Sequence, residues 1–217
     1  MKGREHFKST QHNYDLWSRI YDLVEGWGEV GLCQKALDFL EIKNTERILE
    51  IGSGTGSSLV KIGLANPQGM QVGLDLSFEM CLQAKSKWTR NSRDIAPGLI
   101  NANAIYLPFQ NKSFDAVLIL FALEIIPAEF TQQALSECRR VLFERGKLCV
   151  ASMADAPTLG PLMSMYHWSL RAFPEIINCR PIRLKQVIKT ADFFIERAEL
   201  FSLWSLPVEI VLARMKR

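Results

Sequence analysis

One short stretch of the chain combines an acid with glycines at every second position. The sequence RILEIGSGTG at residues 47–56 places Glu50 in an apolar run, and Gly52, Gly54 and Gly56 follow it. Glycine permits positive φ angles and lets a ligand approach the backbone closely. A tight turn that leads into a helix also presents free N–H groups and the positive end of the helix dipole. The stretch therefore predicts a turn that binds a ligand.

A second acid, Asp75, ends the next apolar run and helps to identify the ligand. A phosphate-binding P-loop is excluded because the turn has no lysine, and the third glycine of the dinucleotide pattern GxGxxG is replaced by Ser57. Asp75 stands where a ribose-binding acid belongs, although it could instead cap a helix that starts at Ser77. Glu50 would repel a pyrophosphate but attract an ammonium group. These groups together match S-adenosylmethionine.

Strands that alternate with helical segments must position this turn. Apolar runs predict strands at residues 47–51, 71–74, 98–100, 114–120 and 147–152, and amphipathic patterns predict helices at 57–65, 78–89 and 130–142. Two further runs, 193–203 and 207–215, are close enough to form an antiparallel hairpin. We therefore expect an α/β, Rossmann-like, seven-stranded mixed sheet with helices on both faces.

The 217 residues are expected to form a single domain. Its parts would be N-terminal helices at 1–44, a cofactor-binding core at 45–153, a cap insertion at 154–182, and a C-terminal helix with the hairpin at 183–217. The cap is predicted because prolines interrupt an apolar stretch that is rich in methionine and aromatic residues. A turn is expected at residues 144–146.

Four motifs, taken in order, resemble those of class I S-adenosylmethionine-dependent methyltransferases: LEIGSGTG, GLDLS, NANAIYLPF and SFDAVLIL. The resemblance covers residues 45–153. Within that superfamily the chain is similar to the ubiquinone/menaquinone-biosynthesis and phospholipid N-methyltransferases, whose aromatic N-terminal helix the segment YDLWSRIYDLV resembles. The resemblance implies methyl transfer from S-adenosylmethionine, with S-adenosylhomocysteine as the product.

The resemblance also assigns the donor site. Glu50 and the Gly52–Gly56 loop, including Ser53, would hold the methionine end of the donor. Asp75 would bind both ribose hydroxyls, and Leu76 would pack near the adenine.

Further residues would surround the rest of the donor. Asn103 and Ala104 would meet the adenine edge, although the family usually has aspartate at position 103; an amide oxygen can still accept a hydrogen bond there. Phe121 would begin a loop that closes over the cofactor. Tyr14 and Tyr21 would cover the donor methyl group, unless this aromatic row only packs in the core.

The catalytic group is left open by the sequence. Many relatives carry histidines where this chain reads FALEII, and His167, Tyr21, Tyr14 and Glu124 are the groups that could accept a proton. The expected acceptor is a small or lipid-like molecule, either a quinone precursor or a phospholipid amine. A nicotinamide-dependent oxidoreductase and a non-catalytic cofactor-binding relative are the alternatives.

Composition limits the remaining partners. The net charge of +3 is too small to indicate nucleic acid, and the five cysteines have no metal-ligand spacing, so no metal is expected. No run is long and apolar enough for a signal peptide or a transmembrane helix. We expect a cytoplasmic protein, with Arg180, Arg183, Lys185 and Lys189 as a candidate contact with an anionic membrane surface. Oligomeric state is open.

Overall fold

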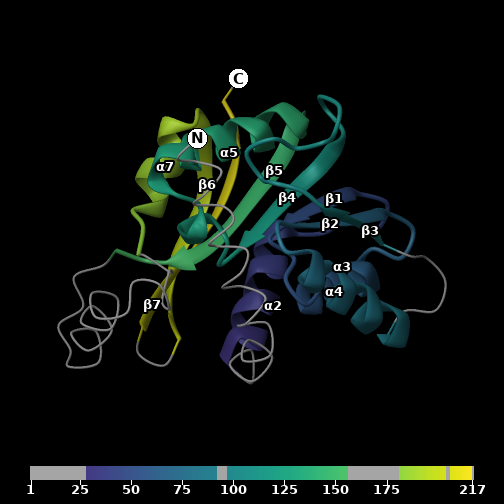
Figure 1. Cartoon of the computed structure of the whole chain (residues 1–217). Coiled ribbons are helices and arrows are strands. Elements are labelled where there is room, and N and C mark those ends of the chain that lie inside the picture. Colours follow the sequence, from purple (N-terminus) through teal and green to yellow (C-terminus); the bar gives the residue numbers. More distant parts are fainter. Residues whose placement is uncertain (1–27, 92–96, 156–180, 204–205, 217) are drawn as a thin grey trace.

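The computed structural model describes residues 28–91, 97–155, 181–203 and 206–216, which form a seven-stranded sheet flanked by helices (Figure 1). The order of the strands is β3-β2-β1-β4-β5-β7-β6. Their bounds are β1 Arg47–Ile51, β2 Met70–Asp75, β3 Gly98–Asn101, β4 Phe114–Leu120, β5 Leu142–Met153, β6 Phe193–Leu203 and β7 Leu206–Met215. The helices are α2 Gly28–Leu40, α3 Ser57–Ala65, α4 Phe78–Asn91, η1 Leu123–Ile125, α5 Ala128–Val141 and α7 Leu184–Thr190.

The sheet is parallel from β3 to β5 and antiparallel beyond it. β1 pairs with β2 and β4 in parallel, whereas β7 pairs with both β5 and β6 antiparallel. The central strands have continuous apolar runs because helices cover both of their faces. The predicted mixed sheet with a C-terminal hairpin is confirmed. Because the strands from β3 to β5 are parallel, their carboxyl ends meet along one edge, which is the edge where open α/β sheets bind ligands.

Two apolar cores lie on opposite faces of the sheet. On one face, Leu135 of α5 and Leu184 of α7 belong to a core that includes Leu49 and Val117 of the sheet. On the other face, buried residues of α2 pack with alternate sheet residues such as Ile48. The helices α3 and α4 contact β2 (Figure 1). The buried Trp88 of α4 packs with Leu59 and Val60 of α3.

The prediction of a turn at residues 144–146 was wrong in one respect, because the structure includes these residues in β5. Phe114 pairs with Leu142, but Ala116, two residues later, pairs with Lys147. The extra residues of β5 therefore form a bulge beside β4 rather than a separate turn before the strand. The irregular backbone that the sequence indicated is present, but it lies inside the element.

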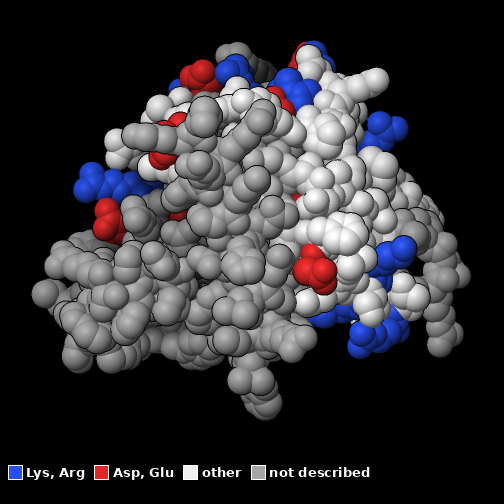
Figure 2. All heavy atoms as spheres, viewed as in Figure 1, with Lys and Arg blue, Asp and Glu red and all other residues white. Residues whose placement is uncertain are grey.

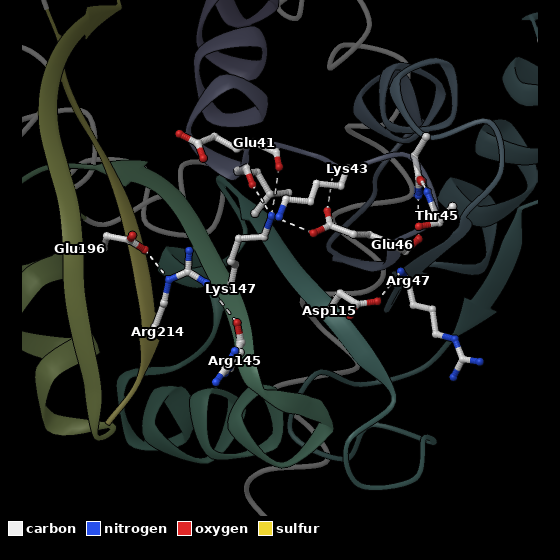
Figure 3. A network of polar contacts seen from close by, with 12 residues as sticks. Glu41, Lys43, Thr45, Glu46, Arg47, Asp115, Arg145, Lys147, Glu196 and Arg214 are labelled. Atoms are coloured by element: carbon white, nitrogen blue, oxygen red, sulfur yellow. Dashed lines mark hydrogen bonds and ion pairs between the residues drawn. The ribbon is translucent and has the colours of Figure 1, made fainter. Parts of the chain in front are cut away.

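A buried lysine fixes the end of α2 against the sheet (Figure 3). Lys147 of β5 donates from Nζ to the carbonyl oxygens of Leu40 and Glu41, at 2.7 and 3.1 Å. The same ammonium group lies 3.0 Å from Oε1 of Glu46, and the side chains of this pair are 8% and 13% exposed. Carbonyl groups in the last turn of a helix have no partner within the helix. Lys147 supplies that partner and thereby holds α2 on the sheet.

Candidate functional site

The glycine loop adopts the left-handed conformation that the sequence predicted. The φ angles of Gly52, Gly54 and Gly56 are 73°, 51° and 83°. The N–H groups of Gly52 and Ser53 both donate to the Leu74 carbonyl oxygen, at 2.7 and 3.1 Å. The loop that follows β1 is therefore fastened to the carboxyl end of β2.

The three glycines are needed for different reasons. A methyl group on Gly52 would lie 2.3 Å from Cβ of Ala122, and one on Gly56 would lie 2.8 Å from Cβ and 2.9 Å from Cα of Ala84. These two glycines therefore permit close packing against η1 and α4. Among the residues that the structure describes, a methyl group on Gly54 would meet nothing within 4 Å. Gly54 is thus the point of the loop that faces open space, where a ligand could approach the backbone.

Gly54→Ala tests this assignment. The substitution should lower the free energy of unfolding by only about 1–2 kcal/mol, because a residue with a Cβ is strained in the left-handed region. The new methyl group would occupy the space above the loop, so the affinity for S-adenosylhomocysteine should fall at least about tenfold. Calorimetric titration and urea unfolding measure the two effects. Unchanged affinity would show that the ligand does not use this space, and Gly56→Ala, which should destabilise more, is the packing control.

Glu50 lies at the carboxyl end of β1 and is only 1% exposed. The hydroxyl group of Ser58, in the first turn of α3, donates to its Oε1. A buried carboxylate is costly unless hydrogen bonds or a cation compensate it. Glu50 therefore places an acceptor for a cationic group directly before the glycine loop. Ser58 was not predicted, because a serine in a helix gives no signal for this role.

Asp75 ends β2 and faces the glycine loop. Its carboxylate accepts hydrogen bonds from the N–H groups of Gly54 and Ser77, both at 2.9 Å. Burial raises the pKa of this carboxyl group, and the hydrogen bonds from backbone N–H groups oppose that rise. The cap of α4 is instead Ser77, whose Oγ accepts from the Met80 N–H at 3.3 Å. Helix capping therefore does not account for Asp75.

The expected adenine-contacting residues lie after β3. Asn103 already accepts the Ile105 N–H on Oδ1 at 3.1 Å, so a second hydrogen bond to the same oxygen would use its other lone pair. Ala104 packs at the margin of the main core. Asn101, which the sequence analysis passed over, donates to the carbonyl oxygens of Asp75 and Leu76 at 3.0 and 2.8 Å. This amide fixes the backbone that carries the acid.

A lysine missed by the sequence analysis braces the loop from α4. Lys87 donates from Nζ to Oγ1 of Thr55 and Oγ of Ser57, at 2.7 and 2.8 Å. Lys87 lies 32 and 30 residues from Thr55 and Ser57 in the sequence, so no motif could have indicated the contact. Lysine and arginine side chains gather on the side of the molecule where Figure 1 places α3 and α4 (Figure 2). Most of α4's basic residues point to solvent, whereas Lys87 is half-buried.

Lys87→Met should loosen the loop. Removing the two charge-assisted hydrogen bonds is expected to cost about 1–3 kcal/mol of unfolding free energy and to weaken S-adenosylhomocysteine binding several-fold. Lys85→Met changes an exposed lysine of the same helix and is the matched control, for which both quantities should stay at the wild-type value. Equal results for the two variants would remove Lys87 from the site.

The chain turns sharply after β4, beside the glycine loop. Phe121 has a φ angle of 52°, which is unusual for a bulky residue, and its N–H donates to the Ala151 carbonyl oxygen at 2.9 Å. Two buried polar atoms near the strand ends accept or donate no hydrogen bond within the described part of the chain: Oγ of Ser53 and Oε2 of Glu124. Such groups are rare in proteins and mark places where a ligand could complete the bonding.

Some of the expected site residues lie outside the described residues, namely Tyr14, Tyr21 and His167, as does most of the expected cap. Within the described ranges no cluster of side chains could hold a metal ion. Among the same residues, no helix is long and apolar enough to cross a membrane. Four of the cysteines are described, and all four are free thiols.

Known proteins resemble this chain in sequence and in fold. A family described as a methyltransferase domain matches residues 48–146. The demethylmenaquinone methyltransferase of Thermus thermophilus is 28% identical over 90% of this chain and 94% of its own length. That of Lactiplantibacillus plantarum is 30% identical over 74% of this chain and 67% of its own. Other curated relatives match over about half of their length.

A solved structure extends the likeness to the whole fold. Magnesium protoporphyrin IX methyltransferase from Synechocystis PCC 6803, with bound S-adenosylhomocysteine, superimposes with a TM-score of 0.73. The match covers 100% of both chains at 18% sequence identity. At this identity the likeness concerns the fold.

Proposed function

The chain belongs to the class I S-adenosylmethionine-dependent methyltransferases, and we propose that its acceptor is a small hydroxylated ring of the quinone-precursor type. The arrangement of three residues in the expected donor site is the observation that best supports methyl transfer. Glu50, the open side of Gly54 and Asp75 stand together at the carboxyl ends of two neighbouring strands. The acceptor is inferred from the relatives that align with most of this chain and are named for demethylmenaquinone.

The residues present fit the donor. Glu50 would attract the ammonium group of its methionine end, and the open backbone at Gly54 would leave room beside it. Asp75 would accept hydrogen bonds from the ribose hydroxyls, because a carboxylate has about four lone-pair sites and the backbone uses only some of them. Leu76, Asn103 and Ala104 would line the adenine side.

S-adenosylmethionine supplies a methyl group that its sulfonium has already activated. The protein's own residues must then hold the acceptor in line with that group and exclude water, which is an effect of proximity and orientation. The buried side chains at the strand ends, such as Glu50, Ser53 and Glu124, would help to exclude water there. An amine or thiolate acceptor needs little else, whereas a ring carbon or a phenol must also lose a proton.

A binding and donor-release assay tests the proposal. The chain should bind S-adenosylmethionine and S-adenosylhomocysteine in a calorimetric titration and should show no competition from NAD(H). Release of S-adenosylhomocysteine should then depend on a reduced naphthoquinone or a benzoquinol rather than on amines, thiols or phosphatidylethanolamine. Absence of binding to either compound would refute the donor, and turnover only with an amine would refute the acceptor.

Two alternatives make different predictions in the same assay. A non-catalytic relative would bind the cofactor but release no product with any acceptor. A protein that works at a membrane should sediment with anionic vesicles at low salt. The basic cluster that suggested such contact is partly neutralised, because Arg183 pairs with Asp155 at 3.0 Å and Lys185 with Glu209 at 2.7 Å. These ion pairs leave less unpaired positive charge for an anionic headgroup.

A further inference from the structure

A buried acid lies at the carboxyl edge of the sheet, close to the donor loop. Glu124 belongs to η1, directly after β4, and is 5% exposed. Its Oε1 accepts the Met153 N–H at 3.2 Å, at the end of β5. Its Oε2 is buried and accepts no hydrogen bond from the described residues. An acid that only stabilised this turn would be expected to have both oxygens satisfied, because an unsatisfied buried acceptor is costly.

The packing of η1 places Glu124 beside the donor site. Ala122, two residues earlier, touches the glycine loop so closely that Gly52 could not carry a side chain. Just past Met153, Ala154 forms a parallel bridge with Ile182, so the carboxyl end of β5 also meets the chain that leads into α7. The segment that carries Glu124 therefore lies between the loop expected to hold the donor and the end of β5, and the Glu124 carboxyl group contacts the β5 side.

The protonation of Glu124 changes near neutral pH. Burial raises the pKa of its carboxyl group from 4.5 to about 7, while hydrogen bonds to the carboxyl group, among them the one from the Met153 N–H, oppose the rise. No charged side chain is among these causes. A carboxylate with a pKa near the working pH can accept a proton and release it again, as a general base must.

We propose that Glu124 is the proton acceptor of the reaction, and that the methyl acceptor is therefore a carbon or oxygen acid, such as a hydroxylated ring. This inference rests on the proposed function. The acceptor atom forms a bond to the methyl group as the sulfur–methyl bond breaks and its electron pair stays on sulfur. The proton of the acceptor passes to Oε2 of Glu124 and later to solvent.

The substitution Glu124→Gln tests the proposal, because glutamine keeps the size and the acceptor for the Met153 N–H but cannot take up a proton. Affinity for S-adenosylhomocysteine should stay within about twofold of the wild type. Methyl transfer to a reduced naphthoquinone should fall at least about a hundredfold. In the wild type kcat should rise with pH through about 7, and this rise should vanish in the variant. Glu129→Gln, at an exposed acid of α5, is the matched control.

A second measurement does not depend on activity. A carboxyl group whose pKa is raised on folding stabilises the folded state most below its ordinary pKa and loses that contribution as pH rises through the raised value. The unfolding free energy of the wild type, relative to Glu124→Gln, should therefore decline between pH 4.5 and about 7.

Three outcomes would overturn the proposal. They are an unchanged rate in Glu124→Gln, the same pH dependence of stability in both proteins, and turnover of amines or thiols with none of hydroxylated rings. If the rate of Glu124→Gln is unchanged while the wild type binds the donor and methylates a hydroxylated ring, the role of Glu124 is refuted but the proposed function still holds.

Discussion

Asp75→Ala is expected to raise the dissociation constant for S-adenosylhomocysteine at least about tenfold. Each hydrogen bond between a carboxylate and a neutral donor contributes about 1.5–3 kcal/mol, and 1.4 kcal/mol corresponds to a factor of ten. The carboxylate faces the loop, where it already accepts the Gly54 N–H at 2.9 Å. Loss of both the ribose contact and this loop contact should weaken binding in calorimetric titration.

Asp115→Ala is the matched control for that experiment. Asp115 lies near the start of β4, at the opposite edge of the sheet, and accepts the Arg47 N–H at 2.8 Å. Asp115→Ala removes the same kind of hydrogen bond but changes nothing in the expected site, so the affinity for S-adenosylhomocysteine should not change. If the two alanine variants bind the ligand equally well, Asp75 has no part in the site.

Affinity should also depend on pH in the wild type. The pKa of Asp75 is raised by burial, so the carboxyl group takes up a proton above its ordinary pKa as pH falls. Protonation removes acceptor capacity, and S-adenosylhomocysteine binding should weaken in that acidic range.

Lys147→Met is expected to lower the free energy of unfolding by about 3–5 kcal/mol, the usual cost of removing one partner of a buried ion pair. Two carbonyl groups at the end of α2 and the carboxylate of Glu46 would lose their cation (Figure 3). The side chains of this pair are 8% and 13% exposed, so little water could replace the lysine. Urea unfolding monitored by circular dichroism measures the change.

Lys112→Met provides the comparison, because Lys112 also forms an ion pair, with Glu144 at 2.7 Å. The side chains of that pair are 59% and 78% exposed, and exposed pairs contribute about 0–1 kcal/mol. The two lysines thus differ in burial and in the two backbone carbonyl groups that Lys147 also contacts. A loss for Lys147→Met no larger than that for Lys112→Met would contradict the assigned role.

Local sequence determined most of the fold. The positions of β1, β4 and α3 follow from apolar periodicity and from the glycines that end the first strand, and the structure places them as predicted. The mixed character of the sheet followed from the two closely spaced runs near the C-terminus, which could only pair antiparallel. The bulge in β5 could not be predicted, because it depends on the register with β4.

The site was predictable only in part. Glu50, the glycines and Asp75 form a motif because the first βα turn and the end of the next strand are brought together in every fold of this class. The roles of Leu76, Asn103, Ala104 and Phe121 remain predictions. Lys87 and Ser58 carried no signal, since a contact between two elements depends on how their faces pack and not on local spacing.

The sequence by itself determined the methyltransferase fold and predicted where its donor site lies, because an acid, a glycine turn and a second acid at fixed spacing specify both the backbone and the charge. Only the tertiary structure distinguished Glu124 from an ordinary surface acid. Its burial, its open oxygen and its closeness to the glycine loop arise from the packing of η1 between β5 and that loop. Burial in turn sets the pKa of Glu124, and no local pattern encodes burial of a single acid.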